Sequence, residues 1–81
     1  MKRYFFNIRD GSAIILDEEG CHLPDDDAAK REALHCARDM LADAIRAGRS
    51  RVPEALLIAD ELGRAVAVVP LVAALPEPLR R

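Results

Sequence analysis

The 81-residue chain has room for one hydrophobic core, which excludes a second folded domain. Its composition, 51% hydrophobic and 32% charged, is that of a globular protein and not of a disordered one. The formal net charge of −2 argues against a dedicated nucleic-acid binder, and no apolar run has signal-peptide or membrane-spanning length. We therefore expect a cytoplasmic protein that binds neither nucleic acid nor a membrane.

Two strands joined by a tight turn are predicted at the start of the chain. Residues 3–9 are rich in aromatic and β-branched side chains. Asp10-Gly11 follows as a hairpin signal, because glycine accepts the positive φ that such turns need. Residues 13–17 form the second strand, which ends or bulges at Glu18-Glu19-Gly20.

A long amphipathic helix is predicted from the Asp25–Asp27 triplet to Arg46. An aspartate at the N-cap accepts a hydrogen bond from a free backbone N–H, and further carboxylates suit the positive end of the helix dipole. Gly48 follows where a helix commonly ends in a left-handed residue. The apolar stripe of this helix consists of Ala29, Ala33, Leu34, Ala37, Met40, Leu41, Ala44 and Ile45.

A second hairpin is predicted after the helix. Residues 55–59 form the third strand and residues 64–69 the fourth, with Asp60–Gly63 as the loop and Pro70 as the stop. Residues 71–75 are apolar and form either a short helical turn or an additional edge segment.

The predicted fold class is therefore α+β with the order ββαββ, a small, mostly antiparallel four-stranded sheet with one long helix packed on one face. Residues 1–75 make the single domain, and residues 76–81 a flexible C-terminal tail.

This architecture leaves one face of the sheet without a cover. Tyr4, Phe6 and Ile8 alternate with Phe5 along the first strand, so apolar side chains point to both sides. The sizeable residues that we assign to the face away from the helix are Phe5, Ile15, Leu57 and Val69, which form the predicted interaction surface.

Three covers for this face are open: a second copy of the chain, a different protein, or the 71–75 segment folded back. We favour a homodimer, because two-fold dimers are the commonest soluble assemblies. The competing interpretation is a small apolar face, shielded by the stems of flanking Lys and Arg side chains.

Residues with catalytic or metal-binding chemistry occur, but not in a pattern typical of a site. Cys21-His22 and His35-Cys36 are adjacent pairs, whereas zinc ligands are usually spaced by two to four residues. No motif surrounds Cys21 that would mark a nucleophile. We expect free thiols, with a disulfide as the alternative that the sequence leaves open.

Charged clusters in the chain have ordinary structural explanations. The Asp25–Asp27 triplet, with Asp17, Glu18 and Glu19 nearby, lacks the alternation of a calcium loop, and helix capping accounts for it. The arginines of the helix and its exit alternate with acidic residues, as on a solvated face. We expect no cofactor, no metal and no enzymatic activity.

Five short motifs occur along the chain: Arg3 to Gly11, Asp17-Glu18-Glu19-Gly20, Leu23-Pro24-Asp25, Asp60-x-x-Gly63-Arg64 and Val69-Pro70-Leu71. With them the chain resembles, over about residues 2–72, a family of short bacterial proteins of unknown function that is abundant in rhizobia and related alphaproteobacteria. The resemblance implies an uncharacterised cytoplasmic protein and transfers no catalytic residue.

The first hairpin leads through the Gly20 to Pro24 turn into the Ala-rich helix of residues 28–41. In this order of elements the chain is also similar, more weakly, to HicB-like antitoxin domains. This chain lacks the C-terminal DNA-binding segment of that pattern.

Three functional hypotheses follow. The first is a non-enzymatic protein-interaction or regulatory module that self-associates and acts on a protein partner. The second is a HicB-like antitoxin or related regulator with nucleic-acid contact. The third is an enzyme that uses Cys21 or the acidic turn.

Overall fold

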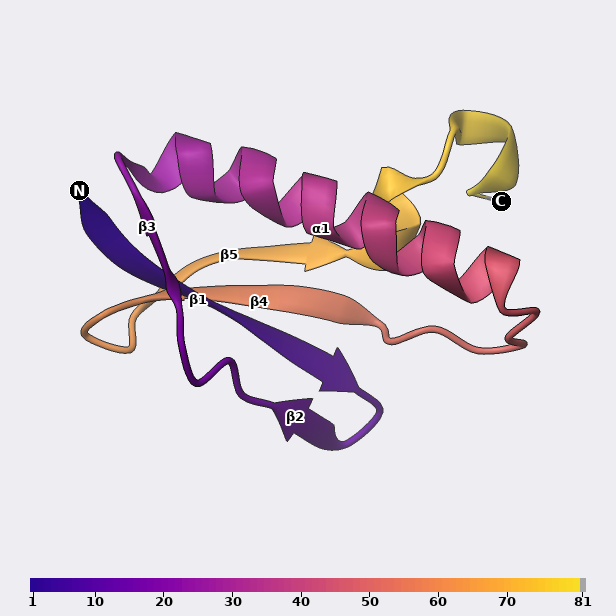
Figure 1. The fold of residues 1–81 in the computed structure, drawn as a ribbon, viewed down its shortest axis with the longest axis horizontal. Coiled ribbons are helices and arrows are strands. Elements are labelled where there is room, and N and C mark those ends of the chain that lie inside the picture. Colours follow the sequence, from indigo (N-terminus) through magenta and orange to yellow (C-terminus); the bar gives the residue numbers. More distant parts are fainter. Residues whose placement is uncertain (81) are drawn as a thin grey trace.

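The computed structural model describes residues 1–80, which form an antiparallel sheet with one long helix across it (Figure 1). The central strand β1 (Lys2–Asp10) pairs with β4 (Ala55–Asp60) on one side, and β4 pairs with β5 (Ala65–Pro70). On its other side β1 pairs with β2 (Ala13–Ile15) and β3 (Cys21–Leu23). The predicted α+β class is confirmed.

The sheet contains one strand more than predicted. β2 pairs with the C-terminal end of β1 and β3 with its N-terminal end, so the two short strands share one edge. β3 follows directly on Gly20 and is three residues long. A strand of this length is too short for an alternating pattern of apolar and polar residues to be recognised. The predicted order ββαββ is thus corrected to βββαββ.

The predicted helix is confirmed as α1 (Asp26–Arg46). Asp25 is its N-cap, and the side-chain Oδ1 accepts a hydrogen bond of 2.8 Å from the backbone N–H of Ala28. Gly48, with a φ of +69°, lets the backbone N–H of Arg49 bond to the carbonyl of Ala44 at 2.9 Å.

Small residues hold α1 close to the sheet. Its buried side chains are Ala28, Ala29, Ala33, Ala37, Leu41 and Ala44. All of these except Ala28 and Ala44 belong to one core cluster with Tyr4, Leu56 and Ile58, which are almost completely buried. Ile45, predicted in the apolar stripe, is instead 73% exposed, whereas its neighbour Ala44 in the same last turn is buried.

The segment after β5 lies on the helix side of the sheet. η1 (Leu71–Ala74) is a short 3-10 turn that packs against α1, and Leu71 belongs to the core. Of the two predicted forms for residues 71–75, the helical turn is therefore the one adopted. Glu77–Leu79 form a second 3-10 turn, η2, within the segment predicted as a tail, and residue 81 lies outside the described residues.

Candidate functional site

The face of the sheet away from α1 carries an apolar patch. Across the strands Asn7 lies opposite Leu57, and Leu57 opposite Val68, so these three side chains share that face. Arg9, two residues after Asn7 on β1, is on this face too, and so is Ile14, which lies opposite Arg9. Leu16 and Phe5 line a hollow on the same face. We call Phe5, Ile14, Leu16, Leu57 and Val68 the outer patch.

Several members of the outer patch are strongly exposed. The exposed fractions are 54% for Ile14, 68% for Leu16 and 55% for Val68, while Phe5 and Leu57 are half-buried. A hollow of about 240 Å³ lies between Phe5, Leu16 and the β4–β5 hairpin. The outer patch therefore combines exposed apolar side chains with a shallow hollow that a partner could fill.

Two of the four residues predicted for the interaction surface lie elsewhere. Val69 pairs with Leu56 and is buried in the core, so its predicted position on the outer face is wrong. Ile15 pairs with Ile8 and lies on the helix side of the sheet. It is nevertheless 54% exposed, because β2 lies beyond the area that α1 covers (Figure 1). The structure places Phe5 and Leu57 on the outer face, as predicted.

Val69 and Ile15 were assigned to the wrong face for the same reason: the sequence does not show which side of the sheet a strand's alternate residues occupy. A shift of one residue in the pairing register moves every side chain of a strand to the opposite face. The turn at Gly11 determines which residues of β2 face outward. For β5 the β4–β5 hairpin and a register shift at Ile58/Ala59 determine it. Sequence reasoning therefore missed Ile14, Leu16 and Val68.

Asp17 organises the loop at the rim of the outer patch. Its Oδ2 accepts a hydrogen bond of 3.1 Å from the N–H of Phe6, in the part of β1 between β2 and β3. Its own N–H donates to Oδ1 of Asn7 at 2.9 Å. Partial burial raises the pKa of Asp17, but the amides of Phe6, Gly20 and Glu19 outweigh it and lower the pKa below its ordinary value.

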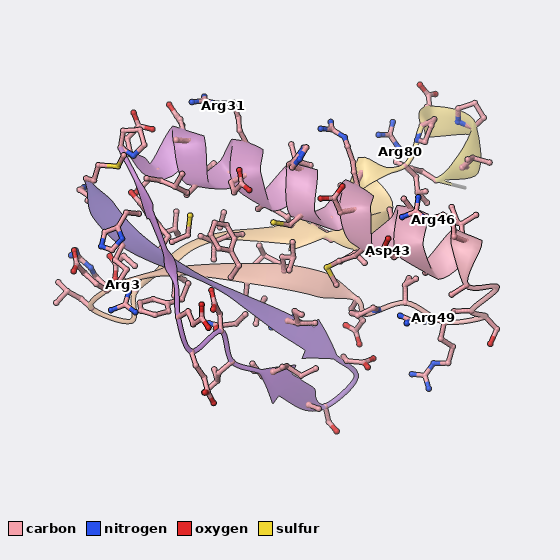
Figure 2. All side chains as sticks on the ribbon, viewed as in Figure 1. Arg3, Arg31, Asp43, Arg46, Arg49 and Arg80 are labelled. Atoms are coloured by element: carbon pink, nitrogen blue, oxygen red, sulfur yellow. The ribbon has the colours of Figure 1, made fainter. Side chains whose placement is uncertain are left out.

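The ring of Phe5 is held from one side by this loop. The Arg3 guanidinium lies 5.1 Å from the Phe5 ring centroid (Figure 2), and its Nε donates to the Glu19 carbonyl at 2.9 Å. A Cβ on Gly20 would meet Phe5 and the Tyr4 carbonyl at 3.0 Å. Gly20, with a φ of +74°, is thus required for the close approach that fixes Phe5.

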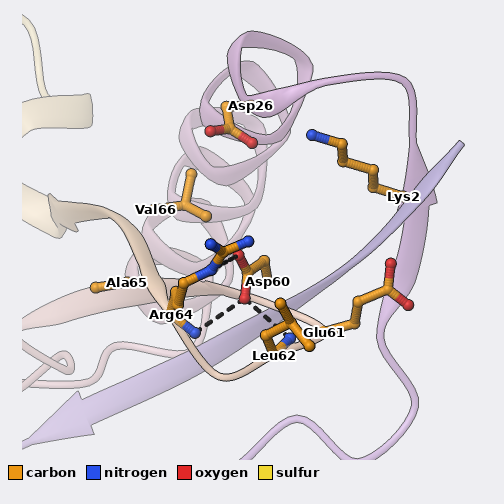
Figure 3. Close-up of a pocket in the computed structure, with 8 residues that line it drawn as sticks. All are labelled: Lys2, Asp26, Asp60, Glu61, Leu62, Arg64, Ala65 and Val66. Carbon is orange, nitrogen blue, oxygen red and sulfur yellow. Dashed lines mark hydrogen bonds and ion pairs between the residues drawn. The ribbon is translucent and has the colours of Figure 1, made fainter.

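A second, charged hollow opens between the N-terminal end of α1 and the β4–β5 hairpin (Figure 3). Its volume is about 620 Å³. We call it the charged hollow, and its lining consists of Lys2, Asp26, Asp60, Glu61, Leu62, Arg64, Ala65 and Val66.

Two acidic residues of the charged hollow already have hydrogen-bond donors. Asp60 accepts from the N–H groups of Leu62 and Arg64 and from the Arg64 Nε, each at 2.9 Å. These bonds lower the pKa of Asp60. The buried Tyr4 hydroxyl donates to Asp26 Oδ1 at 2.7 Å, and this hydrogen bond, with burial, raises the pKa of Tyr4 to about 12.

The sulfur and imidazole groups do not assemble into a site. Cys21 and Cys36 are half-buried free thiols. Burial raises the pKa of Cys36, and the nearby carboxylate of Glu32 adds to the effect, so this thiol stays protonated at neutral pH. Within residues 1–80, no three His, Cys, Asp or Glu side chains are placed to hold a metal ion.

Sequence reasoning did not predict the charged hollow, because it depends on which strand ends meet. The start of β1 and the end of β4 come together only through the register that places Tyr4 opposite Asp60. The Asp60-x-x-Gly63-Arg64 pattern signalled a hairpin and no more.

Comparisons with known proteins identify a family without an assigned activity. A family model described as a domain of unknown function (DUF6894) matches residues 3–73. No match was found among curated proteins or among solved structures. No helix within residues 1–80 has the length and apolar character needed to cross a membrane.

Proposed function

We propose a function from the surface of the protein alone, because the chain belongs to the DUF6894 family, a domain of unknown function. This membership confirms the resemblance to an uncharacterised family. The protein is a non-enzymatic interaction module that self-associates through the outer patch and regulates a protein partner. The observation that carries this proposal is the apolar outer face, which no described segment of the chain covers.

The intramolecular cover considered from sequence does not apply. Residues 71–75 pack on the helix side, with Leu71 in the core and η1 against α1. Two covers therefore remain for the outer patch, a second copy of the chain and a different protein. A two-fold dimer brings the same patch together twice, which favours the second copy.

The size of the patch predicts a weak dimer. Complete burial of an aliphatic side chain contributes about 1.5–3 kcal/mol. Ile14, Leu16 and Val68 are each a little more than half exposed, so one chain contributes roughly 3–5 kcal/mol and a dimer twice that. Association itself costs about 4–15 kcal/mol, so at most about 6 kcal/mol remains, and we expect a Kd of tens of micromolar or weaker.

The proposal is tested by placing a charge in the middle of the patch. Val68→Asp is expected to weaken self-association at least about tenfold, because an unpaired carboxylate would be buried in the interface. Light scattering during size-exclusion chromatography measures the change, and circular dichroism confirms the fold.

Leu79→Asp is the matched control, because Leu79 is 64% exposed in η2 and lies outside the outer patch. It should leave association unchanged. Equal association of the wild type and Val68→Asp would contradict the proposal. Phe5→Asp is a second variant, expected to weaken association while the helical signal persists.

The alternative function, a HicB-like regulator with nucleic-acid contact, finds less support on the surface. Arg46 on the exposed side of α1 is paired with Asp43 (Figure 2), and His35 lies near Asp39. Such mixed charge disfavours contact with a phosphate backbone. A salt-dependent shift of the protein with DNA or RNA would reverse this preference.

A further inference from the structure

The charged hollow is lined by both signs of charge, and some of these groups lack a partner. Among residues 1–80, neither the Lys2 ammonium nor the Glu61 carboxylate takes part in an ion pair or side-chain hydrogen bond. The Asp26 side chain bonds to Tyr4 through Oδ1 only, and the Arg64 side chain bonds to Asp60 through Nε only. Two cationic donors and two anionic acceptors thus remain available.

These groups come from three separate elements and face one space. Lys2 begins β1, Asp26 lies in the first turn of α1, and Glu61 and Arg64 belong to the β4–β5 hairpin (Figure 3). Val66 and Leu62 add apolar surface to the same lining. The volume of about 620 Å³ lies within the range of small-molecule sites.

The balance of charges decides which ligand fits. A simple anion would meet the carboxylates of Asp26 and Glu61, and a simple cation would meet Lys2 and Arg64. A ligand that carries both charges can be bound by groups of both signs, because cationic and anionic side chains line the same hollow (Figure 3). An aliphatic substituent would contact Val66.

We infer that the charged hollow binds a small zwitterion, an α-amino acid or a short peptide with an aliphatic side chain. Lys2, Asp26 and Arg64 of the charged hollow do not line the hollow of the outer patch, so this inference does not depend on dimerisation there, although Asp60 and Glu61 line both hollows.

The test is an NMR titration of the full chain labelled with ¹⁵N. L-leucine, up to about 10 mM, should shift the amide signals of Asp26 and residues 61–66 in a saturable way. Two analogues isolate the charges: 4-methylpentanoate lacks the ammonium, and isoamylamine lacks the carboxylate. Each should bind at least about tenfold more weakly than L-leucine. Glycyl-leucine distinguishes a peptide from a free amino acid.

Variants that remove one charge each locate the site. Lys2→Gln and Glu61→Gln should each weaken L-leucine binding about tenfold without loss of fold, because both side chains are exposed. Arg49→Gln, beyond the other end of α1 (Figure 2), and Glu18→Gln are the matched controls and should leave binding unchanged.

Several results would overturn the inference. The first is that neither L-leucine nor glycyl-leucine shifts the amide signals of residues 61–66 at the highest concentration. Equal binding of the singly charged analogues would show that charge balance does not select the ligand. Undiminished binding in both Lys2→Gln and Glu61→Gln would place the ligand elsewhere.

Discussion

The Asp17 side chain accepts a backbone hydrogen bond in the middle of β1, where neither β2 nor β3 pairs with this strand. Between the segments paired with β2 and β3, the N–H of Phe6 faces the β2–β3 loop, and an unbonded N–H there would be costly. Both carboxylate oxygens are used, Oδ2 by Phe6 and Oδ1 by Glu19 and Gly20. The loop that supports Phe5 therefore depends on an ionised Asp17.

Asp17→Asn is expected to destabilise the fold by about 1–3 kcal/mol at neutral pH, because an amide has only one acceptor oxygen. The folded-state pKa of Asp17 is lowered from 3.8, so its contribution is complete above that value. The contribution is lost as the pH falls through the folded-state pKa.

The difference in unfolding free energy between wild type and Asp17→Asn should therefore shrink below about pH 4. Urea denaturation at a series of pH values measures it. A difference that stays constant down to pH 2 would show that the charge of Asp17 contributes nothing.

At the scale of elements, local signals decided how well the sequence predicted the structure. The Asp25 cap and the regular apolar spacing of α1 act within a few residues, so the helix was predicted to its last residue, Arg46. The faces of β2 and β5 depend on register against β1 and β4, which no local pattern contains. Ile14 and Ile15 are both apolar, and only the pairing of Ile15 with Ile8 separates their faces.

Leu41→Ala is expected to lower the unfolding free energy by about 2–4 kcal/mol, because it opens a cavity between α1 and the sheet. Ile45→Ala, one turn later and 73% exposed, should change it by less than about 0.5 kcal/mol. Thermal or urea denaturation of the two variants checks the boundary of the apolar stripe. Equal losses would mean that α1 is rotated relative to the packing described above.

At the scale of the whole molecule, the number of layers determines what is left exposed. One helix covers one face of the sheet, and composition with element order was enough to predict that arrangement. The charged hollow could not be predicted in this way, because it needs the ends of β1, β4 and α1 at one place. The Ile15 side chain lies on the helix side of the sheet, so a partner on the outer face would leave it exposed.

The oligomeric state as a function of concentration tests the central claim most directly. Sedimentation equilibrium of the wild-type chain from about 10 µM to about 1 mM begins below the expected Kd. The average mass should rise from that of one chain towards that of two, and in Val68→Asp this rise should need a concentration at least about tenfold higher. A folded wild-type protein that keeps the mass of one chain at every concentration would contradict self-association through the outer patch.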